Sequence, residues 1–437
     1  MPCRELTYSS PADWQSIRQW LDKRRKPDFS VEKGVREILN QVYQHGDDAL
    51  VDYSRQFDCP DFTAHDICVP KSEIQHRTAE IPAKDKAILE QAVGNVRKFH
   101  EQQVQRSWWQ SGSDCAILGQ MIRPVERVGL YVPGGQSGTT PLISSMIMNA
   151  VPAQVAGVDA VAVVTPPRRD GSLDPYLLAM AELLEVDELY RLGSAWAIAA
   201  LALGTQTVPA VDVIAGPGNI HVTTAKRLLV GQVGIDMIAG PSEIVILADH
   251  TANAEWVAAD MLSQAEHDPL AASILISTDA DLIPQIKSAL TRQLTELPRV
   301  DTARKSLADW GALVYTPSLR AGATLINRLA PEHLELCVND PWNTLGMIRN
   351  AGAVFLGHHC PEPVGDYFAG PNHVLPTMGT ARFASGLSVD NFMKKTNIIS
   401  TNCEYLRAHG PAIARLASLE GLEAHARSVL QRTTEGT

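Results

Sequence analysis

The feature that most constrains the fold is an alternation of short apolar runs with stretches of helical periodicity, from about residue 128 to residue 357. The apolar runs lie at 128–132, 161–164, 211–214, 243–247, 272–276 and 353–357, and helical patterns over 142–155, 176–184 and 254–264 separate them. Continuous apolar strands separated by helices are typical of parallel sheets that are covered on both faces. We therefore expect an α/β protein with two Rossmann-like parallel-sheet domains, one inserted in the other.

The flanking segments set the expected domain boundaries. Residues 1–27 form a short polar N-terminal arm, and helical patterns begin at about residue 31. The first α/β domain is expected to be discontinuous, with residues 28–130 and 243–386, and the second to span residues 131–242. From residue 387 the alternation ends, and residues 387–437 are expected to form a helical C-terminal tail.

Composition excludes several classes of protein. The 437 residues are 45% hydrophobic and 20% charged, with 38 Lys and Arg against 49 Asp and Glu, a net charge of −11. An acidic balance argues against a nucleic-acid binder and against a polybasic membrane anchor. No signal-peptide pattern or spanning apolar run is present, and the seven cysteines are scattered without a C-x-x-C pair. A cytoplasmic protein is the simplest expectation.

Three glycine turns follow predicted strands, at 133–138, 216–219 and 240–243. None of them is a G-x-G-x-x-G fingerprint or a Walker A loop. A glycine turn that enters a helix can present backbone N–H groups to a phosphate or pyrophosphate, although any turn between a strand and a helix can also require glycine. The turns are compatible with a dinucleotide but do not identify one.

Several nitrogen and oxygen donors could form a metal site. Gln264 and His267 are three residues apart near the end of a predicted helix and share a face. Asp366 follows the predicted strand 353–357, where an α/β sheet places its ligand-binding carboxyl end, and His373 and His425 lie downstream. Amide, imidazole and carboxylate donors suit Zn²⁺. The alternative for His267 is an ordinary interaction with the end of its helix.

Glu332 and His333 are adjacent and follow a proline. A carboxylate and an imidazole so placed could divide proton transfers between an alcohol and a water molecule. An exposed glutamate beside a helix-capping histidine is the alternative. Neither reading is decided by the spacing alone.

Together these motifs resemble the histidinol dehydrogenase family, which is zinc- and NAD-dependent and catalyses the last step of histidine biosynthesis. The resemblance extends from about residue 30 to about residue 430. Its densest matches are at 128–135, 216–219, 238–243, 262–267, 331–334, 365–367, 372–377 and 420–425. So many ordered motifs are far more specific than any one of them.

The resemblance implies a role for individual residues. It implies that the catalytic residues are Glu332 and His333, that the zinc ligands are Gln264, His267, Asp366 and His425, and that the cofactor contacts are Tyr131 and Asn219. It implies that the substrate is held by Ser242, His373 and Glu420 together with His333 and the four zinc ligands. It also implies a homodimer in which the tail carrying Glu420 and His425 crosses to the neighbouring subunit, so that each active site is shared.

Two positions depart from the family pattern. Trp196 stands where the family usually has a glutamine that contacts the cofactor, and an indole offers one donor and no acceptor. The turn at 136–140 is about three residues longer than the common family turn. Both departures concern NAD binding, while the residues implied in the chemistry are present.

The reaction that the resemblance implies is the oxidation of L-histidinol by two NAD⁺ and water, through histidinaldehyde, to L-histidine and two NADH. One Zn²⁺ per subunit would hold the substrate, and no nucleic acid or membrane would be involved. The alternatives are a paralogous zinc and NAD dehydrogenase acting on another hydroxylated substrate, a catalytically silent zinc-binding subunit and a zinc hydrolase. Ser242, His373 and Glu420 favour histidinol over another alcohol.

Overall fold

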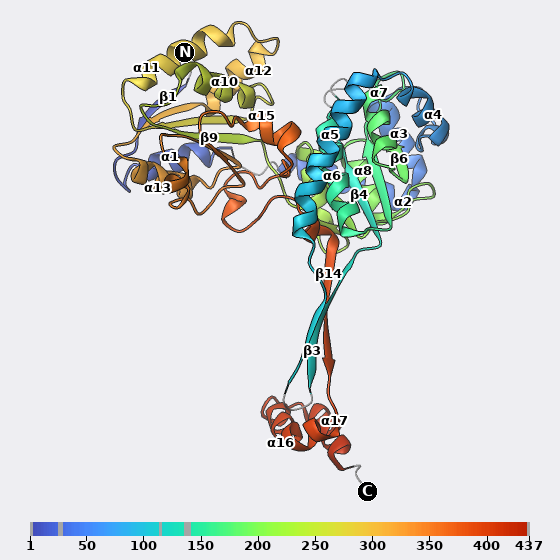
Figure 1. The fold of residues 1–437 in the computed structure, drawn as a ribbon. Helices are drawn as coiled ribbons and strands as arrows, with labels where there is room; N and C mark the ends of the chain where they lie inside the picture. The colour runs from blue at the N-terminus through green and yellow to red at the C-terminus, as the bar shows by residue number, and fades with distance from the viewer. Residues whose placement is uncertain (1–2, 25–28, 113–115, 135–140, 435–437) are drawn as a thin grey trace. The chain divides into compact units, whose positions relative to one another are not determined.

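The computed structural model describes the chain except for residues 1–2, 25–28, 113–115, 135–140 and 435–437 (Figure 1). The chain forms two compact units, a larger one from Met1–Gln103 and Glu126–Phe392 and a smaller one from Val104–Val125 and Met393–Thr437. Among the described helices, none combines the length and the apolar character needed to cross a bilayer.

Six parallel strands form the first sheet of the larger unit, which we call sheet A. Its order is β1-β11-β10-β9-β12-β13. The bounds are β1 (Arg4–Thr7), β9 (Glu243–Ala248), β10 (Ala272–Ser277), β11 (Ala312–Tyr315), β12 (His333–Cys337) and β13 (Ala353–Leu356). One face is covered by α10 (Ala254–Ala265), α11 (Leu282–Leu294) and α12 (Val300–Trp310), and the other by α1 (Trp14–Leu21) and α13 (Leu319–Leu329) (Figure 1). The central strands β9 and β10 are mainly apolar because both of their faces are buried, as adjacent Ile246 and Leu247 show with no exposed surface.

Five parallel strands form the second sheet, sheet B, in the order β6-β5-β4-β7-β8. The bounds are β4 (Arg127–Tyr131), β5 (Ala160–Thr165), β6 (Glu188–Arg191), β7 (Val213–Ala215) and β8 (Gly234–Ile235). Its flanking helices are α6 (Ile143–Ala156), α7 (Pro175–Leu183), α8 (Ser194–Leu203) and α9 (Ile220–Leu229). Sheet B lies between β1 and β9 in the sequence, so the expected pair of parallel sheets, one inserted in the other, is confirmed.

The structure corrects the expected domain boundaries at the N-terminal side. The bounds of the helices concerned are α2 (Phe29–His45), α3 (Asp47–Phe57), α4 (Lys71–Thr78) and α5 (Ala83–His100). Helix α2 packs on α8 and α9, α4 on α7, and α5 on α6. Of residues 28–130, expected to join residues 243–386, helices α2 to α5 and strand β4 therefore belong to the side of sheet B, and residues 104–125 belong to the smaller unit. The expected N-terminal arm, residues 1–27, also contains strand β1, which pairs with β11 in sheet A.

The smaller unit contains an antiparallel sheet and two helices. Strands β2 (Trp108–Ser111), β3 (Ile117–Pro124) and β14 (Met393–Ser400) pair in the order β14-β3-β2. Helices α16 (Cys403–Leu419) and α17 (Glu423–Thr434) pack against each other. The expected helical C-terminal tail is confirmed by α16 and α17, but residues 393–400 form the strand β14, whose residues are almost all exposed. A strand without a buried face has no apolar alternation to predict it.

Candidate active site

The predicted catalytic pair lies at the amino ends of two neighbouring strands of sheet A. His333 is the first residue of β12 and pairs with Ile244 of β9, and Glu332 precedes it. From β9 the chain adds β10 and β11 on one side and then β12 and β13 on the other, so the strand order reverses between β9 and β12. Ligands of open α/β sheets usually bind outside the carboxyl ends at such a point. Here the polar residues gather at the opposite ends.

This corrects the expectation that Asp366 lies at the carboxyl end of the strand 353–357. After β13 the chain runs back along β12 and forms the short helix α15 (Glu362–Val364). The backbone N–H of Glu362 donates to Oε1 of Glu335 in β12 at 2.8 Å. Asp366 then comes within 3.8 Å of His333, measured from Oδ1 to Nε2. Asp366 is therefore beside the catalytic pair, as expected, but for a different reason.

A π-helical turn, η4 (Gly365–Ala369), carries Asp366. π-helical turns are rare and are frequent at functional sites. The turn lies close to β13, because a Cβ added to Gly365 would be 2.7 Å from Cε1 of Phe355. Asn95 Nδ2 of α5 donates to the carbonyl of Phe368 at 2.8 Å. The turn is thus fixed by contacts with both a strand and a helix.

His333 is held in one tautomer with a free ring nitrogen. Its Nδ1 lies 3.2 Å from the backbone carbonyl of Glu243, which can only accept, so Nδ1 carries the proton. Its Nε2 is buried, has no hydrogen-bond partner and lies 3.9 Å from Oε1 of Glu362. Burial lowers the pKa of His333 to about 3. The side chain is a neutral imidazole whose Nε2 lone pair is available to take a proton.

Glu332 is buried beside this imidazole. Its Oε2 accepts from the backbone N–H of Glu243 at 2.8 Å and lies 3.8 Å from Nδ1 of His333. Burial raises the pKa of Glu332 well above its usual range. Glu243 is itself held by Arg24 Nη1 at 2.8 Å and by the N–H of Met378 at 3.0 Å. The pair therefore rests on a rigid network of hydrogen bonds.

The predicted metal ligands of the larger unit include buried donors without partners. Gln264, near the end of α10, has no exposed surface, and neither of its amide atoms has a hydrogen-bond partner. His267 follows on the same helix end and is exposed, and it is near enough to His333 and His373 to lower the pKa of each. Leaving a buried amide unpaired costs stability, so a ligand for it is expected.

Asp366 lies close to two histidines, His333 and His373. His373 Nδ1 donates to the Asp366 backbone carbonyl at 3.1 Å and lies 3.9 Å from Oδ1. Burial raises the pKa of Asp366 to about 6, and burial with the charge of Asp366 raises that of Glu362 to about 8. A divalent cation among these groups would favour their ionised forms. Amide, imidazole and carboxylate donors of this kind fit Zn²⁺.

The remaining predicted substrate residues fall in two places. Ser242 is half-buried immediately before β9, and its carbonyl accepts from Arg24 Nη2 at 3.3 Å. Glu420 and His425 belong to the smaller unit, where Glu420 ends α16 and His425 lies in α17. Both are exposed. The structure of the larger unit thus brings together Ser242, Gln264, His267, Asp366, His373 and the catalytic pair, and leaves the two tail residues in the other unit.

The two predicted cofactor residues lie at the carboxyl ends of neighbouring strands in sheet B. Tyr131 ends β4, and Asn219 follows β7 as the N-cap of α9. The strand order of sheet B reverses between β4 and β7, where α/β sheets bind dinucleotides. Gly216 has φ +118°, and a Cβ there would lie 2.2 Å from the carbonyl of Tyr131. Only glycine allows these two strand ends to approach so closely.

Both cofactor candidates already make local hydrogen bonds. The Tyr131 hydroxyl is buried and accepts from the N–H of Ser194 at 3.2 Å. Ser194 has φ +46°, an unusual conformation for a residue with a Cβ, and it begins α8. Asn219 Oδ1 accepts from the N–H groups of His221 and Val222. Their contacts with a cofactor stay predictions.

Trp196 packs inward. Its ring stacks on Tyr53 at 5.7 Å and on Phe57 at 5.6 Å between centroids, and its Nε1 has no hydrogen-bond partner. The indole therefore fills the contact between α3 and α8. The longer turn at 136–140 lies outside the described residues.

Three further residues support the site and were missed by the sequence reasoning. Glu362 stands one helical turn before Asp366, which is the only signal that could have found it. Glu243 follows Ser242 in the glycine turn at 240–243, and the sequence gives no sign that its carboxylate binds Arg24. Arg24 was placed in a polar arm, although its side chain is 3% exposed in its pair with Glu243. Contacts between such distant residues have no pattern in the sequence.

Two parallel sheets with a buried centre of unpaired imidazole, amide and carboxyl groups define an α/β enzyme. A family model described as histidinol dehydrogenase matches residues 21–433. The histidinol dehydrogenase of Oleidesulfovibrio alaskensis is 60% identical over 99% of this chain and 100% of its own length. That of Nitratidesulfovibrio vulgaris is 57% identical over 100% of both chains.

A solved structure agrees with these sequences. The crystal structure of histidinol dehydrogenase from Elizabethkingia anophelis matches with a TM-score of 0.91 and 34% identity, over 98% of each chain. The chain belongs to the histidinol dehydrogenase family and is an oxidoreductase.

Proposed function

We propose that the chain oxidises L-histidinol to L-histidine through histidinaldehyde with two NAD⁺, in the last step of histidine biosynthesis. The observation that carries the proposal is the buried, unpartnered Nε2 of His333 beside Asp366, in a chain of this family. A base is needed to take the proton of an alcohol as its hydride leaves, and this nitrogen is a buried acceptor without a partner.

A single Zn²⁺ per subunit is proposed, with Gln264, His267, Asp366 and His425 of the partner subunit as ligands. The ion has no redox chemistry of its own, and it would supply a fixed positive charge that binds and orients the substrate. The two orphaned amide atoms of Gln264 support a ligand at this point. Ser242, His373 and Glu420 are proposed to hold the substrate beside these groups.

The chain's own groups would then move the protons. His333 Nε2 takes the alcohol proton, and the carbonyl of Glu243 stabilises the resulting imidazolium through Nδ1–H. Glu332 activates the water that hydrates the aldehyde, and His333 serves again as the base for the second oxidation. Holding the aldehyde in place between the two steps is an orientation effect.

NAD⁺ would supply the hydride acceptor for both oxidations. We place it at the strand ends of β4 and β7, beside Tyr131 and Asn219. The reversal of strand order there and the glycine contact between the strand ends support this placement. Sheet B is therefore the proposed cofactor side and sheet A the catalytic side.

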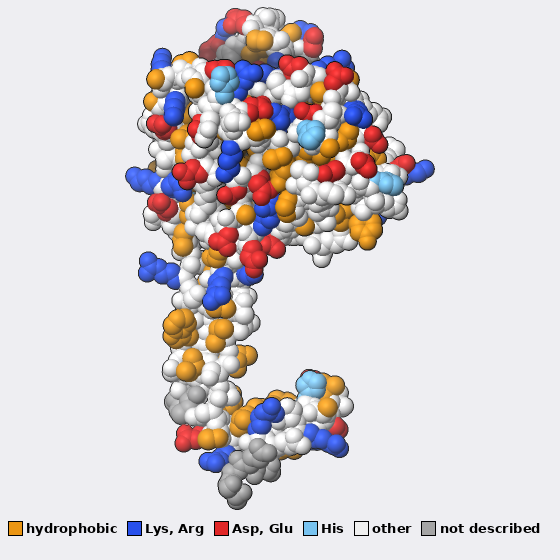
Figure 2. All heavy atoms as spheres, turned by 90° about the vertical axis from the view of Figure 1, so that its right-hand side faces the viewer, with side chains coloured by type: hydrophobic (Ala, Val, Ile, Leu, Met, Phe, Trp, Pro, Cys, Tyr) orange, Lys and Arg blue, Asp and Glu red, His pale blue; other side chains and the backbone are white. Residues whose placement is uncertain are grey.

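A homodimer with shared sites is proposed from the family resemblance, with Glu420 and His425 of the smaller unit contributing to the site of the neighbouring subunit. That unit exposes large apolar side chains, including Trp109 at 70% and Ile399 at 74% (Figure 2). Exposed apolar surface of this kind is typical of protein interfaces. A cytoplasmic location stays a prediction.

Hybrid dimers test whether each active site is shared between the two subunits. The His333→Asn and His425→Ala variants should each be inactive, whereas hybrids formed from them contain one intact site. A random equal mixture should regain about a quarter of the wild-type activity. No regain in dimers shown to exchange would contradict shared sites.

The function itself is tested by NADH formation from purified protein, L-histidinol and NAD⁺, with an EDTA-treated control. About two NADH per histidinol, lost with EDTA and restored by zinc, is the expected result. Turnover only with another alcohol would contradict the proposed substrate, and zinc binding without any turnover would indicate a silent subunit.

A further inference from the structure

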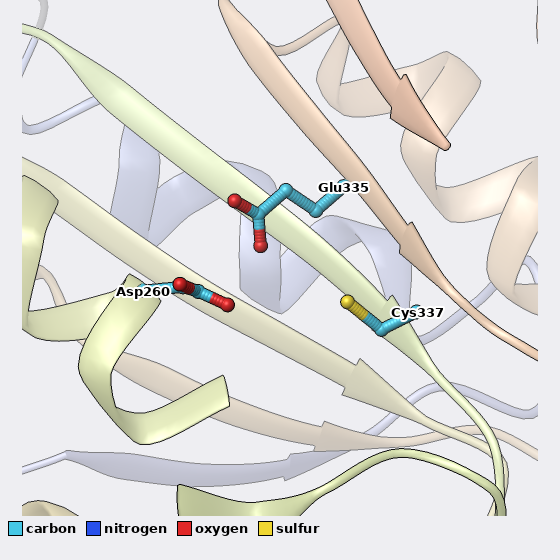
Figure 3. A group of neighbouring side chains, drawn as sticks. All are labelled: Asp260, Glu335 and Cys337. Carbon is cyan, nitrogen blue, oxygen red and sulfur yellow. The ribbon is translucent and has the colours of Figure 1, made fainter. Parts of the chain in front are cut away.

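A second group of titratable side chains lies on the same face of β12 as His333. Asp260 of α10 and Glu335 and Cys337 of β12 have ligand atoms within 4.8 Å of one another (Figure 3). Side chains two residues apart on a strand point to the same face. His333, Glu335 and Cys337 therefore form one row that faces α10, and the group is adjacent to the catalytic imidazole without belonging to the mechanism above.

Glu335 is the centre of this group. It is 1% exposed, and its Oε1 accepts from the N–H of Glu362 at 2.8 Å. A carboxyl oxygen of Glu335 lies within 4.8 Å of one of Asp260, which Figure 3 shows on the adjacent helix. Two ionised carboxylates are both acceptors, and Oε2 of Glu335 then has no donor. One proton shared between the two groups removes this conflict.

The proton belongs on Glu335. Burial raises the pKa of Glu335 well above its usual range and that of Asp260 to about 6, and a hydrogen bond between them raises the first and lowers the second. A neutral Glu335 matches its partners, because its O–H can donate to the Asp260 carboxylate while its carbonyl oxygen accepts from Glu362.

We propose that Glu335 is a neutral positioning residue that joins the three elements carrying the zinc ligands and the base. It lies on β12 with His333. It donates to Asp260, one turn before Gln264 on α10, and it accepts from Glu362, one turn before Asp366. The inference rests on the proposed zinc site and deepens it. Small displacements of such groups are costly, since a shift of about 1 Å can lower a rate by about 100-fold.

A second metal ion in this group is the competing reading, and the observations disfavour it. Oε1 of Glu335 is already bonded to a backbone N–H. Burial raises the pKa of Cys337 far above its usual value, which keeps the thiol protonated, whereas metals bind the thiolate. The group is better explained as a hydrogen-bonded link.

The test compares Glu335→Gln with Glu335→Leu in the full-length protein. Glutamine keeps both bonds, because its amide donates to Asp260 and its oxygen accepts from Glu362. Leucine fills the space and makes neither. Cys337→Ala is the matched control on the same row. Zinc per chain, zinc affinity by chelator competition, kcat, KM for histidinol and Tm are measured for each.

We expect Glu335→Gln and Cys337→Ala to keep zinc affinity within about threefold of wild type, and Glu335→Leu to weaken it by about 10–100-fold, as the loss of groups that orient metal ligands does. Should Glu335→Leu fail to fold, Asp260→Ala breaks the same link and is expected to act in the same direction. If Glu335→Leu and Asp260→Ala both lower Tm but leave the zinc affinity unchanged, the positioning role is overturned.

Two other results would also overturn it. An equal loss of zinc affinity in Glu335→Gln and Glu335→Leu would mean that a negative charge on Glu335 is needed. A second zinc ion that is bound by the wild type and lost in Cys337→Ala would show that the group is a metal site. A wild-type chain that neither binds zinc nor oxidises histidinol would overturn the proposed function itself. Active wild type with an unaffected Glu335→Leu variant would overturn the positioning role alone.

Discussion

The two sheets of the larger unit present their functional side chains in different states. At the amino ends of sheet A, polar atoms of Gln264, His333 and Glu362 are buried without partners. At the carboxyl ends of sheet B, Tyr131 and Asn219 already bond to the backbone. Unpaired buried groups are costly unless a ligand satisfies them. The buried groups at sheet A therefore fit a bound ligand, whereas Tyr131 and Asn219 at sheet B also hold the local backbone.

This difference has consequences for mutation. Changes that remove the unpartnered atoms of Gln264 or His333 should alter chemistry or metal binding with little effect on the fold, because these atoms make no hydrogen bond within it. Changes at sheet B should affect stability and cofactor affinity together. The predictions below test this contrast.

The largest expected effect is that of His333→Asn. Loss of the base should lower kcat by roughly 10²–10⁴-fold while zinc content and Tm stay close to wild type. Steady-state kinetics, metal analysis and thermal unfolding measure these quantities. An unchanged kcat would exclude His333 as the base.

Glu332→Gln should have a smaller and selective effect. The amide oxygen can still accept from the N–H of Glu243, so the local structure is kept, but the group cannot activate water. Oxidation of histidinaldehyde should slow by roughly 10²-fold and more than oxidation of histidinol. The two half-reactions are measured separately by single-turnover kinetics, and equal slowing of both would count against the assigned role.

Variants of Asn219 distinguish its role as a helix cap from its proposed role in binding NAD⁺. Asn219→Ala removes the helix cap and should cost about 0.5–2 kcal/mol of stability, whereas Asn219→Ser keeps a capping oxygen. Both variants lack the amide, so both should raise KM for NAD⁺ by roughly 3–10-fold. A normal KM in the serine variant would show that Asn219 is only a cap.

The smallest expected effect concerns Asp58, at the end of α3. Its Oδ2 is buried without a partner, and burial raises its pKa to about 7. The unfolded chain ionises this group near pH 4, so its burial costs stability as pH rises from about 4 to 7 and remains costly above 7.

Asp58→Asn should therefore raise Tm at pH 8 by roughly 1–3 °C, and this gain should vanish as pH falls to about 4. Thermal unfolding of both proteins between pH 4 and pH 8 measures the difference. A gain that does not depend on pH would contradict the buried, uncharged state of Asp58.

The contrast between the sheets also explains what the sequence could predict. Strands such as β9 and β10 are buried on both faces, and their apolar runs predict them well. Helices α2 and α3 are amphipathic, but an apolar face does not specify which sheet it covers. That choice depends on contacts such as α2 with α8, between residues far apart in the chain.

The same holds for the site. Adjacent residues such as Glu332 and His333, and the resemblance of ordered motifs, indicated where the chemistry lies. The amino-end location could not be predicted, because it follows from the return of residues 357–366 along β12. Glu335 was missed because a glutamate in a strand has no signal that distinguishes a buried neutral carboxyl from an exposed charged one.

The central claim is that one zinc ion joins two chains beside His333. Diffraction at the zinc absorption edge from crystals of active dimer tests it most directly. We predict one anomalous peak per subunit, within coordination distance of Gln264, His267 and Asp366 and of His425 of the partner subunit. A peak away from these residues, or none in crystals of active enzyme, would contradict the claim.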